Sequence, residues 1–193
     1  SIQVEIENVA RLLGAMETER TTPVVVSSNH DRALIRYIVD NVRDWASDPA
    51  NALFFLRTQT AAYEAMEQSL PFDPVSWNIN RINPDLKTIW LRRDEEFNVA
   101  GISCENHGDT GPNGSRGGLN GFVKMGVRMC VGHSHTAAIK DGVFQSGVTC
   151  RKDLDYAKGP SSWSWSHTLI YPNGKRTIVT MVLDKDGKAI WRN

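Results

Sequence analysis

The sequence changes its periodicity near Thr88, and this change limits the folds that the chain can adopt. Before Thr88, apolar residues recur at helical spacing over 2–16, over 29–45 and from Asp48-Pro49 to Leu70, with one short apolar run over 22–28. After it, strand-like runs dominate, and they are separated by dipeptides typical of hairpin turns: Asp141-Gly142, Asn173-Gly174 and Asp186-Gly187. Helices with one strand, followed by a series of strands, predict an α/β fold with mixed β-sheets flanked by helices.

Shorter signals complete this outline. Prolines at 71, 74 and 84 predict a loop after the last helix. Thr88–Arg92 and Phe97–Cys104 are expected to be strands, and a mobile, glycine-rich loop is expected over 108–121. A short apolar run, Lys124–Val131, leads from this loop into a second polar segment.

The length and composition fit one globular domain. With 193 residues, of which 40% are hydrophobic and 23% charged, the chain can bury a proper core. We expect residues 1–193 to be the C-terminal part of a single domain, mainly helical over 1–86 and mainly β over 87–193. Because the chain begins with Ser1 and enters an amphipathic run at once, we expect it to have been cut from a longer polypeptide.

Charge and cysteine content exclude several classes of protein. Lys plus Arg and Asp plus Glu both number 22, so a nucleic-acid substrate would need a local basic patch. No apolar stretch approaches the length of a membrane span, and no signal peptide is visible, so we expect no membrane partner. The three cysteines form no C-x-x-C pair, which indicates a reducing, cytosolic compartment. Cys104 and Cys130 lie in apolar runs and are expected to be buried, inert thiols.

Three polar motifs contain most of the five histidines and follow strand-like runs: Asn29-His30-Asp31, Glu105–Asp109 with His107, and Gly132-His133-Ser134-His135. Alternate residues of an extended segment point to the same side, so His133 and His135 could face one point. Neutral imidazole is a common metal ligand, and carboxylate and amide oxygens fill harder positions. A helix N-cap would also explain Asn29-His30-Asp31, and His-x-His also occurs on exposed strands. The fifth histidine, His167, lies in an alternating run and is expected to pack structurally.

The order of these motifs resembles that of the calcineurin-like metallophosphoesterase superfamily. The family is marked by D-x-H, G-D-x-x, G-N-H-D/E, an isolated His and G-H-x-H. The last three appear here as Ser28-Asn29-His30-Asp31, His107 and Gly132–His135, with Ser28 in place of the first Gly. The resemblance implies a partial metallophosphoesterase-type α/β sandwich that lacks the N-terminal strands and helices of the full fold.

The resemblance also implies roles for these residues and two divalent metal ions, with Mn²⁺ expected and Fe, Zn or Mg as alternatives. Asn29, His107 and His133 would ligate the second metal, and His135 would ligate the first. His30 would stabilise the phosphoryl transition state or protonate the leaving oxygen, and Asp31 would orient its ring. The two metals would clamp the phosphate and activate a water molecule for in-line attack.

The first two motifs of the family are absent, because Ser1–Ser28 contains no His and no Asp. We expect an upstream segment of the same polypeptide, or a second chain, to supply the missing ligands. The chain alone should then bind the second metal weakly and the first hardly at all. The alternative is a non-catalytic binding module with a decayed metal site.

The glycine-rich segment after His107 is a candidate phosphate-binding loop. Its backbone N–H groups, including that of Gly117, could cradle a phosphate, and Arg116 could contact the oxygens with two hydrogen bonds. A flexible connector explains the segment equally well. Other candidate contacts with a nucleic-acid backbone are Arg92, Arg93, Lys124, Arg128, Arg151, Lys152, Lys175 and Arg176, with ordinary solvated charges as the alternative.

A narrower resemblance covers the C-terminal half. The segments 99–102, 132–136, 141–147, 159–163 and 171–176 are similar to phage-encoded members of the superfamily, among them the pre-early DNase-type proteins of T-five-like phages. This resemblance implies a nuclease that acts on host DNA in the bacterial cytoplasm. A phosphomonoesterase or a small cyclic-nucleotide phosphodiesterase is the alternative within the enzyme class, and the neutral net charge favours it. A homo-oligomer is left open.

Overall fold

The computed structural model describes residues 1–39, 48–93, 95–150 and 159–192. They form two compact units, Ser1–Leu91 and Arg92–Asn193. Both units combine helices with strands, so the predicted α/β class is confirmed.

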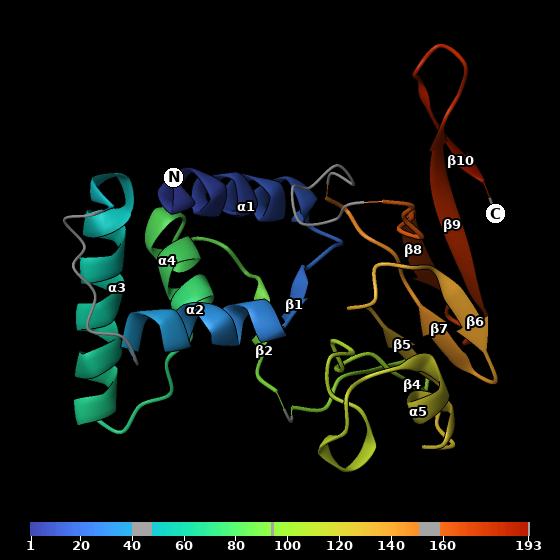
Figure 1. Cartoon of the computed structure of the whole chain (residues 1–193), viewed down its shortest axis with the longest axis horizontal. Helices are drawn as coiled ribbons and strands as arrows, with labels where there is room; N and C mark the ends of the chain where they lie inside the picture. Colours follow the sequence, from blue (N-terminus) through green and yellow to red (C-terminus); the bar gives the residue numbers. More distant parts are fainter. Residues whose placement is uncertain (40–47, 94, 151–158, 193) are drawn as a thin grey trace. The chain divides into compact units, whose positions relative to one another are not determined.

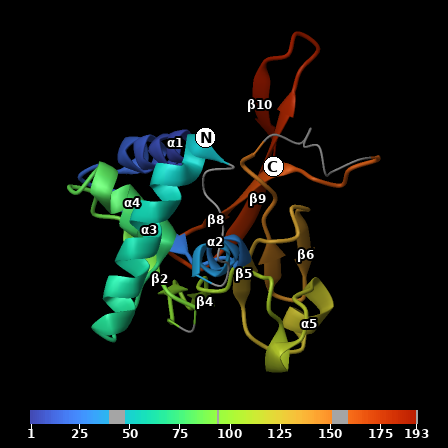
Figure 2. The same ribbon diagram turned by 60° about the vertical axis from the view of Figure 1, so that its left-hand side comes forward.

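The first unit consists of helices that pack on one another and a two-stranded parallel sheet (Figure 2). Its elements are α1 (Ile2–Met16), β1 (Val24–Val26), α2 (Asn29–Val39), α3 (Pro49–Glu67), α4 (Pro74–Ile82) and β2 (Ile89–Leu91). Its core consists of Ile6, Ala10, Leu13, Ile38, Phe54, Phe55 and Ile79. The helices expected over 2–16 and from Asp48-Pro49 onward are confirmed. The helix expected over 29–45 is present as α2, whereas Val42 and Trp45 lie outside the described residues.

Helix α4 corrects the loop expected from the prolines. Asp73 caps the helix, because its Oδ1 accepts a hydrogen bond from the Ser76 backbone N–H at 2.6 Å, and Pro74 occupies the first turn. The buried Asn78 side chain donates to the Pro74 carbonyl at 2.8 Å and to Thr58 Oγ1 of α3 at 3.0 Å. Asp-Pro therefore starts a helix here just as Asp48-Pro49 does at α3.

The second unit contains a five-stranded sheet with the order β3-β4-β5-β7-β6. Strands β4, β5 and β7 run parallel to one another, and β3 and β6 pair antiparallel at the two edges. Their bounds are β3 (Asn98–Val99), β4 (Ile102–Ser103), β5 (Met129–Val131), β6 (Ala138–Lys140) and β7 (Val143–Gln145). A short helix, α5 (Leu119–Val123), places Phe122 in a buried cluster with Met129, Val131 and Val143.

A three-stranded antiparallel meander completes this unit (Figure 1). It consists of β8 (Trp165–Ile170), β9 (Arg176–Leu183) and β10 (Ala189–Arg192). All three predicted hairpin turns are confirmed, and at Asp141-Gly142 both residues have positive φ, 42° and 87°, as a two-residue turn between twisted strands requires. Backbone hydrogen bonds from Gly147 N to Ser166 O and from Val148 N to Ser164 O join the meander to the segment after β7.

One expectation about strands was wrong. Residues 97–104 form the hairpin β3–β4 instead of one strand, because Ala100 and Gly101 turn the chain with φ of 50° and 74°. The three polar motifs follow strands of two different sheets, since β1 pairs with β2 while β4 and β5 belong to the five-stranded sheet. None of the described helices is both long and apolar enough to cross a bilayer.

Candidate functional site

His107 and His133 lie side by side beyond the ends of two neighbouring parallel strands. His107 follows β4 and His133 follows β5, and Gly132 N donates to His107 O at 2.9 Å. The two imidazole rings have centroids 5.3 Å apart and planes inclined at 73°. The Nε2 atom of His107 is buried. The structure therefore brings together two of the predicted ligands of the second metal.

Gly108 makes this approach of the two segments sterically possible. Its φ is +111°, a value that favours glycine. A Cβ at this position would lie 3.0 Å from Gly132 O and 3.2 Å from the Cβ of His133. A side chain would thus push apart the segments that carry His107 and His133.

The backbone of the Gly132–His135 motif is bent instead of extended, which corrects the expectation from the sequence. His133 and His135 both adopt left-handed conformations, with φ of 65° and 64°. Such conformations cost about 1–3 kcal/mol at residues other than glycine and concentrate at functional sites. The prediction that His133 and His135 point to the same side, as alternate residues of an extended strand would, therefore does not apply.

His135 contacts an aromatic side chain. Its ring lies edge-to-face against Trp163, with centroids 4.3 Å apart, and its carbonyl accepts from Ser164 N at 3.1 Å. Within the described parts of the chain, no three His, Cys, Asp or Glu side chains gather as a metal-binding group. The assembled part of the predicted site is thus the pair His107 and His133.

In the first unit, Asn29-His30-Asp31 begins α2 and takes part in a capping box. Ser28 Oγ accepts from the backbone N–H groups of His30 at 3.2 Å and Asp31 at 3.4 Å, and Asp31 Oδ2 accepts from Ser28 N at 2.7 Å. The Asp31 carboxylate thus caps the helix, a use different from the expected orientation of the His30 ring. His30 is exposed, whereas Asn29 Oδ1 is buried and has no hydrogen-bond partner among the residues that the structure describes.

The polar residues around His107 support its loop. Glu105 accepts from Ser103 Oγ at 2.7 Å and from the N–H groups of Cys104 and Phe97. Burial alone would raise the pKa of Glu105, but these hydrogen bonds together hold it below the ordinary value. Asn106 Oδ1 accepts from Gly108 N at 2.8 Å.

Arg93 fixes the start of the glycine-rich loop, and sequence reasoning missed this role. Its guanidinium donates to both carboxylate oxygens of Asp109, at 2.8 and 2.7 Å, and to Thr110 Oγ1 at 2.8 Å. Burial would raise the pKa of Asp109, but the hydrogen bonds and charge of Arg93 outweigh it and hold the pKa below its ordinary value. Sixteen positions separate the partners, so no local pattern reveals the pair.

The glycine-rich loop is closed on itself. Thr110 and Arg116 form a β-bridge, and Gly111 N donates to Ser115 O at 2.7 Å. Gly117 N donates to Asp109 O at 2.8 Å, so this N–H is not available to a phosphate in this conformation. A Cβ on Gly117 would lie 1.9 Å from Gly108 O, so a glycine at 117 allows the two backbone segments to pack this closely. Arg116 is exposed.

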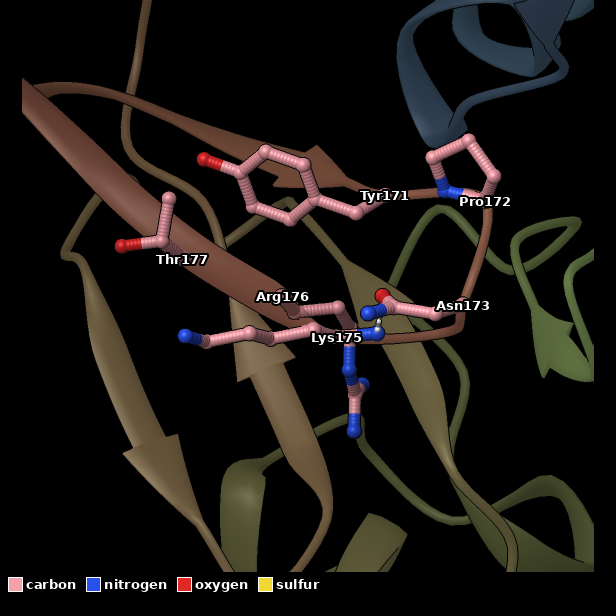
Figure 3. A pocket seen from close by; sticks show the side chains of 6 residues that line it. All are labelled: Tyr171, Pro172, Asn173, Lys175, Arg176 and Thr177. Atoms are coloured by element: carbon pink, nitrogen blue, oxygen red, sulfur yellow. Dashed lines mark hydrogen bonds between the residues drawn. The ribbon is translucent and has the colours of Figure 1, made fainter.

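Several of the other candidate phosphate contacts have partners within the second unit. Arg92 pairs with Glu95 at 3.8 Å, Arg128 donates to the carbonyl of Gly174, and Arg176 Nη1 donates to Met129 O at 2.7 Å. Lys124 and Lys175 are exposed, and Arg151 and Lys152 lie outside the described residues. A hollow of about 610 Å³ at the β8–β9 turn is lined by Tyr171, Pro172, Asn173, Lys175, Arg176 and Thr177 (Figure 3).

Comparison with known proteins identifies a relative from a phage. The chain is 37% identical over 186 residues to "Protein A1" of Escherichia phage T5. The chain is similar to a phage protein. The match covers 95% of the chain and 33% of the relative, so the chain spans about a third of that protein's length. No family model and no solved structure matches the sequence, and membership of the metallophosphoesterase superfamily stays a prediction.

Proposed function

We propose that this chain carries part of the active site of a metal-dependent phosphoesterase, which in the intact protein hydrolyses phosphodiester bonds of DNA. The observation that carries the proposal is the pair His107 and His133, whose rings lie 5.3 Å apart beyond adjacent strand ends. Strand ends are rigid supports for ligands, because the sheet beneath fixes the loops that leave it. The order of the motifs, which resembles that of the metallophosphoesterases, supports the same function.

The residues present suit a divalent cation. Imidazole nitrogen is a good ligand for Mn, Fe and Zn, and the buried amide oxygen of Asn29 is the kind of donor that Mn²⁺ accepts. The assignment of Asn29 and His135 as ligands rests on the resemblance and stays a prediction. Divalent ions bound at such a site would stabilise charge on the phosphate and activate water. An upstream segment or a second chain would supply the remaining ligands.

The chain's own residues would position the substrate. Arg116 is exposed on a loop that Arg93 and the Thr110–Arg116 bridge hold in place, and a guanidinium can bind two phosphate oxygens at once. The exposed His30 would protonate the leaving oxygen, as the resemblance implies. The similarity to a phage protein is compatible with action in the bacterial cytoplasm, and host DNA as the substrate is what the resemblance to phage-encoded metallophosphoesterases implies.

A small phosphate ester is the second candidate substrate. Lys plus Arg and Asp plus Glu both number 22, so the whole chain does not attract a polyanion. Cleavage of plasmid DNA, bis-p-nitrophenyl phosphate and p-nitrophenyl phosphate in the presence of Mn²⁺ separates the candidates. A nuclease should cleave the first two, and its DNA affinity should fall steeply with salt. A phosphomonoesterase should cleave only the third.

Native mass spectrometry with and without Mn²⁺ tests the metal site directly. The intact wild-type protein should retain Mn²⁺, and its His107→Ala and His133→Ala variants should each lose it. The matched control is His167→Ala, because His167 lies on β8 and its ring packs 5.7 Å from that of Trp191. Equal retention of Mn²⁺ by all four proteins would contradict the proposal.

A further inference from the structure

Two cysteines lie side by side beneath the candidate site. Ser103 of β4 pairs with Met129 of β5 in parallel register, so the next residues, Cys104 and Cys130, are also neighbours. Adjacent strands lie about 4.8 Å apart, which falls within the range of about 4.4–6.8 Å between the Cα atoms of disulfide-bonded cysteines. Both residues are only half-buried, which corrects the expectation of buried, inert thiols.

An arginine from the meander holds a positive charge beside Cys130. Arg176 Nη1 lies 3.9 Å from Cys130 Sγ, and Nη2 donates to Gly142 O at 2.8 Å. The guanidinium also lies over the ring of Phe144, with 4.1 Å to the centroid. Figure 3 shows Arg176 and the exposed Lys175 pointing in different directions from adjacent positions of the turn. The packed guanidinium can therefore stabilise a thiolate at Cys130.

The two thiols differ in acidity. A hydrogen bond with the Cys104 thiol lowers the pKa of Cys130 to about 7, against the effect of burial and with help from the charges of Arg176 and Arg128. The same hydrogen bond raises the pKa of Cys104, as do burial and the charges of Cys130 and Glu105. These groups are the charged and titratable neighbours that govern the pair. They make Cys130 the nucleophile and Cys104 the thiol that resolves its oxidised form.

We propose that Cys104 and Cys130 form an oxidisable thiol pair that hydrogen peroxide converts into a disulfide. The Cys130 sulfur attacks one peroxide oxygen, the O–O bond breaks, and the products are a sulfenic acid at Cys130 and water. The Cys104 sulfur then attacks the sulfenic sulfur, the S–O bond breaks, and the S–S bond forms with release of a second water. Two electrons and both thiol protons pass to the peroxide. This chemistry is independent of the proposed phosphoesterase activity.

Peroxide treatment of the metal-free chain, followed by alkylation and peptide mapping by mass spectrometry, tests the pair. Cys150 is exposed and serves as an internal control. The expected result is a Cys104–Cys130 cross-linked peptide that has lost two hydrogens, with Cys150 alkylated. Full alkylation of Cys130 after oxidation, or a disulfide that includes Cys150, would overturn the proposal.

A variant separates the two roles. In Cys104→Ser, peroxide should leave a sulfenic acid at Cys130 that dimedone traps, whereas the wild-type protein should show no adduct there. The iodoacetamide rate at Cys130 in the wild-type protein provides a second measurement that needs no variant. It should rise with pH around 7, below the range of an ordinary thiol. A rate that rises only above about pH 8 would contradict an activated Cys130.

Discussion

The two units contain histidine motifs that the fold uses in different ways. In the first unit, Ser28 and Asp31 are hydrogen-bonded to the backbone at the start of α2, so helix capping accounts for much of the motif. In the second unit, His133 adopts a left-handed backbone and contacts His107, and the buried cluster consists of other residues. A motif that costs strain and adds nothing to the core is the stronger candidate for function.

This comparison predicts opposite results for two histidine substitutions. His133→Ala should weaken Mn²⁺ binding by at least about 100-fold, since removal of a metal ligand exceeds the 10–100-fold effect of losing a supporting residue. His30→Ala should leave Mn²⁺ affinity within about twofold and should slow turnover by roughly 10²–10⁴-fold in the intact protein, the usual contribution of a general acid. Isothermal titration with Mn²⁺, together with phosphodiesterase assays, gives both values.

Equal loss of Mn²⁺ in the two variants would contradict the distinction between the motifs, because it would make His30 a ligand as well. Retention of Mn²⁺ by His133→Ala would show that His133 is not a ligand. The exposed position of His30 ensures that its substitution has little effect on folding, so a change in binding can be interpreted directly.

The glycine-rich loop of the second unit should be sensitive to a single methyl group. Gly117→Ala would place a Cβ 1.9 Å from Gly108 O and should lower the free energy of unfolding by about 1–3 kcal/mol. Gly118→Ala is the matched control, because its Cβ would meet nothing within 4 Å. Urea unfolding of both variants measures the difference. Equal stabilities would show that the loop does not need close contact between 108 and 117.

The Arg93–Asp109 pair adds a pH dependence to the stability of the second unit. Asp109 has a folded-state pKa below its ordinary value of about 3.9. Its contribution to stability is therefore fully present above the unfolded-state pKa and disappears as the pH falls through the lower, folded-state pKa. At pH 7, Asp109→Asn should cost about 1.5 kcal/mol, the usual contribution of hydrogen bonds to a charged group.

Denaturant unfolding at pH 7 and at about pH 3 checks this prediction. The difference between wild type and Asp109→Asn should shrink at the lower pH, and the exposed Asp141→Asn should change stability by less than about 0.5 kcal/mol at pH 7. A difference that is the same at both pH values would indicate that the charge of Asp109 contributes nothing.

Local chemistry was readable from the sequence, and long-range pairing was not. The hairpin turns Asp141-Gly142 and Asn173-Gly174 and the helix start at Pro49 depend on residues next to one another, and all were predicted. The left-handed Ala100 gave no signal, because alanine rarely adopts positive φ, and the β3–β4 hairpin was missed.

The same distinction between local signals and long-range pairing applies to the candidate site. The positions of His107 and His133 after strands were predictable, since apolar runs precede both. The parallel pairing of β4 with β5, which brings these histidines together, depends on contacts between distant segments, as do the partners of Arg93 and Arg176. Periodicity carries no information about such pairs, so the neighbouring thiols Cys104 and Cys130 also remained hidden.

The smallest expected effect concerns the cap of α2. Ser28→Ala should lower the free energy of unfolding by about 1 kcal/mol, because two backbone N–H groups lose their acceptor. Ser28→Gly, which introduces the glycine found in the resembling family, should cost only a few tenths of a kcal/mol. Thermal unfolding of the two variants gives the difference. Because Ser28 is not itself a predicted ligand, Mn²⁺ affinity should stay within about twofold in both variants, and a large loss of affinity would show that the capping hydrogen bonds are needed to hold Asn29 as a ligand.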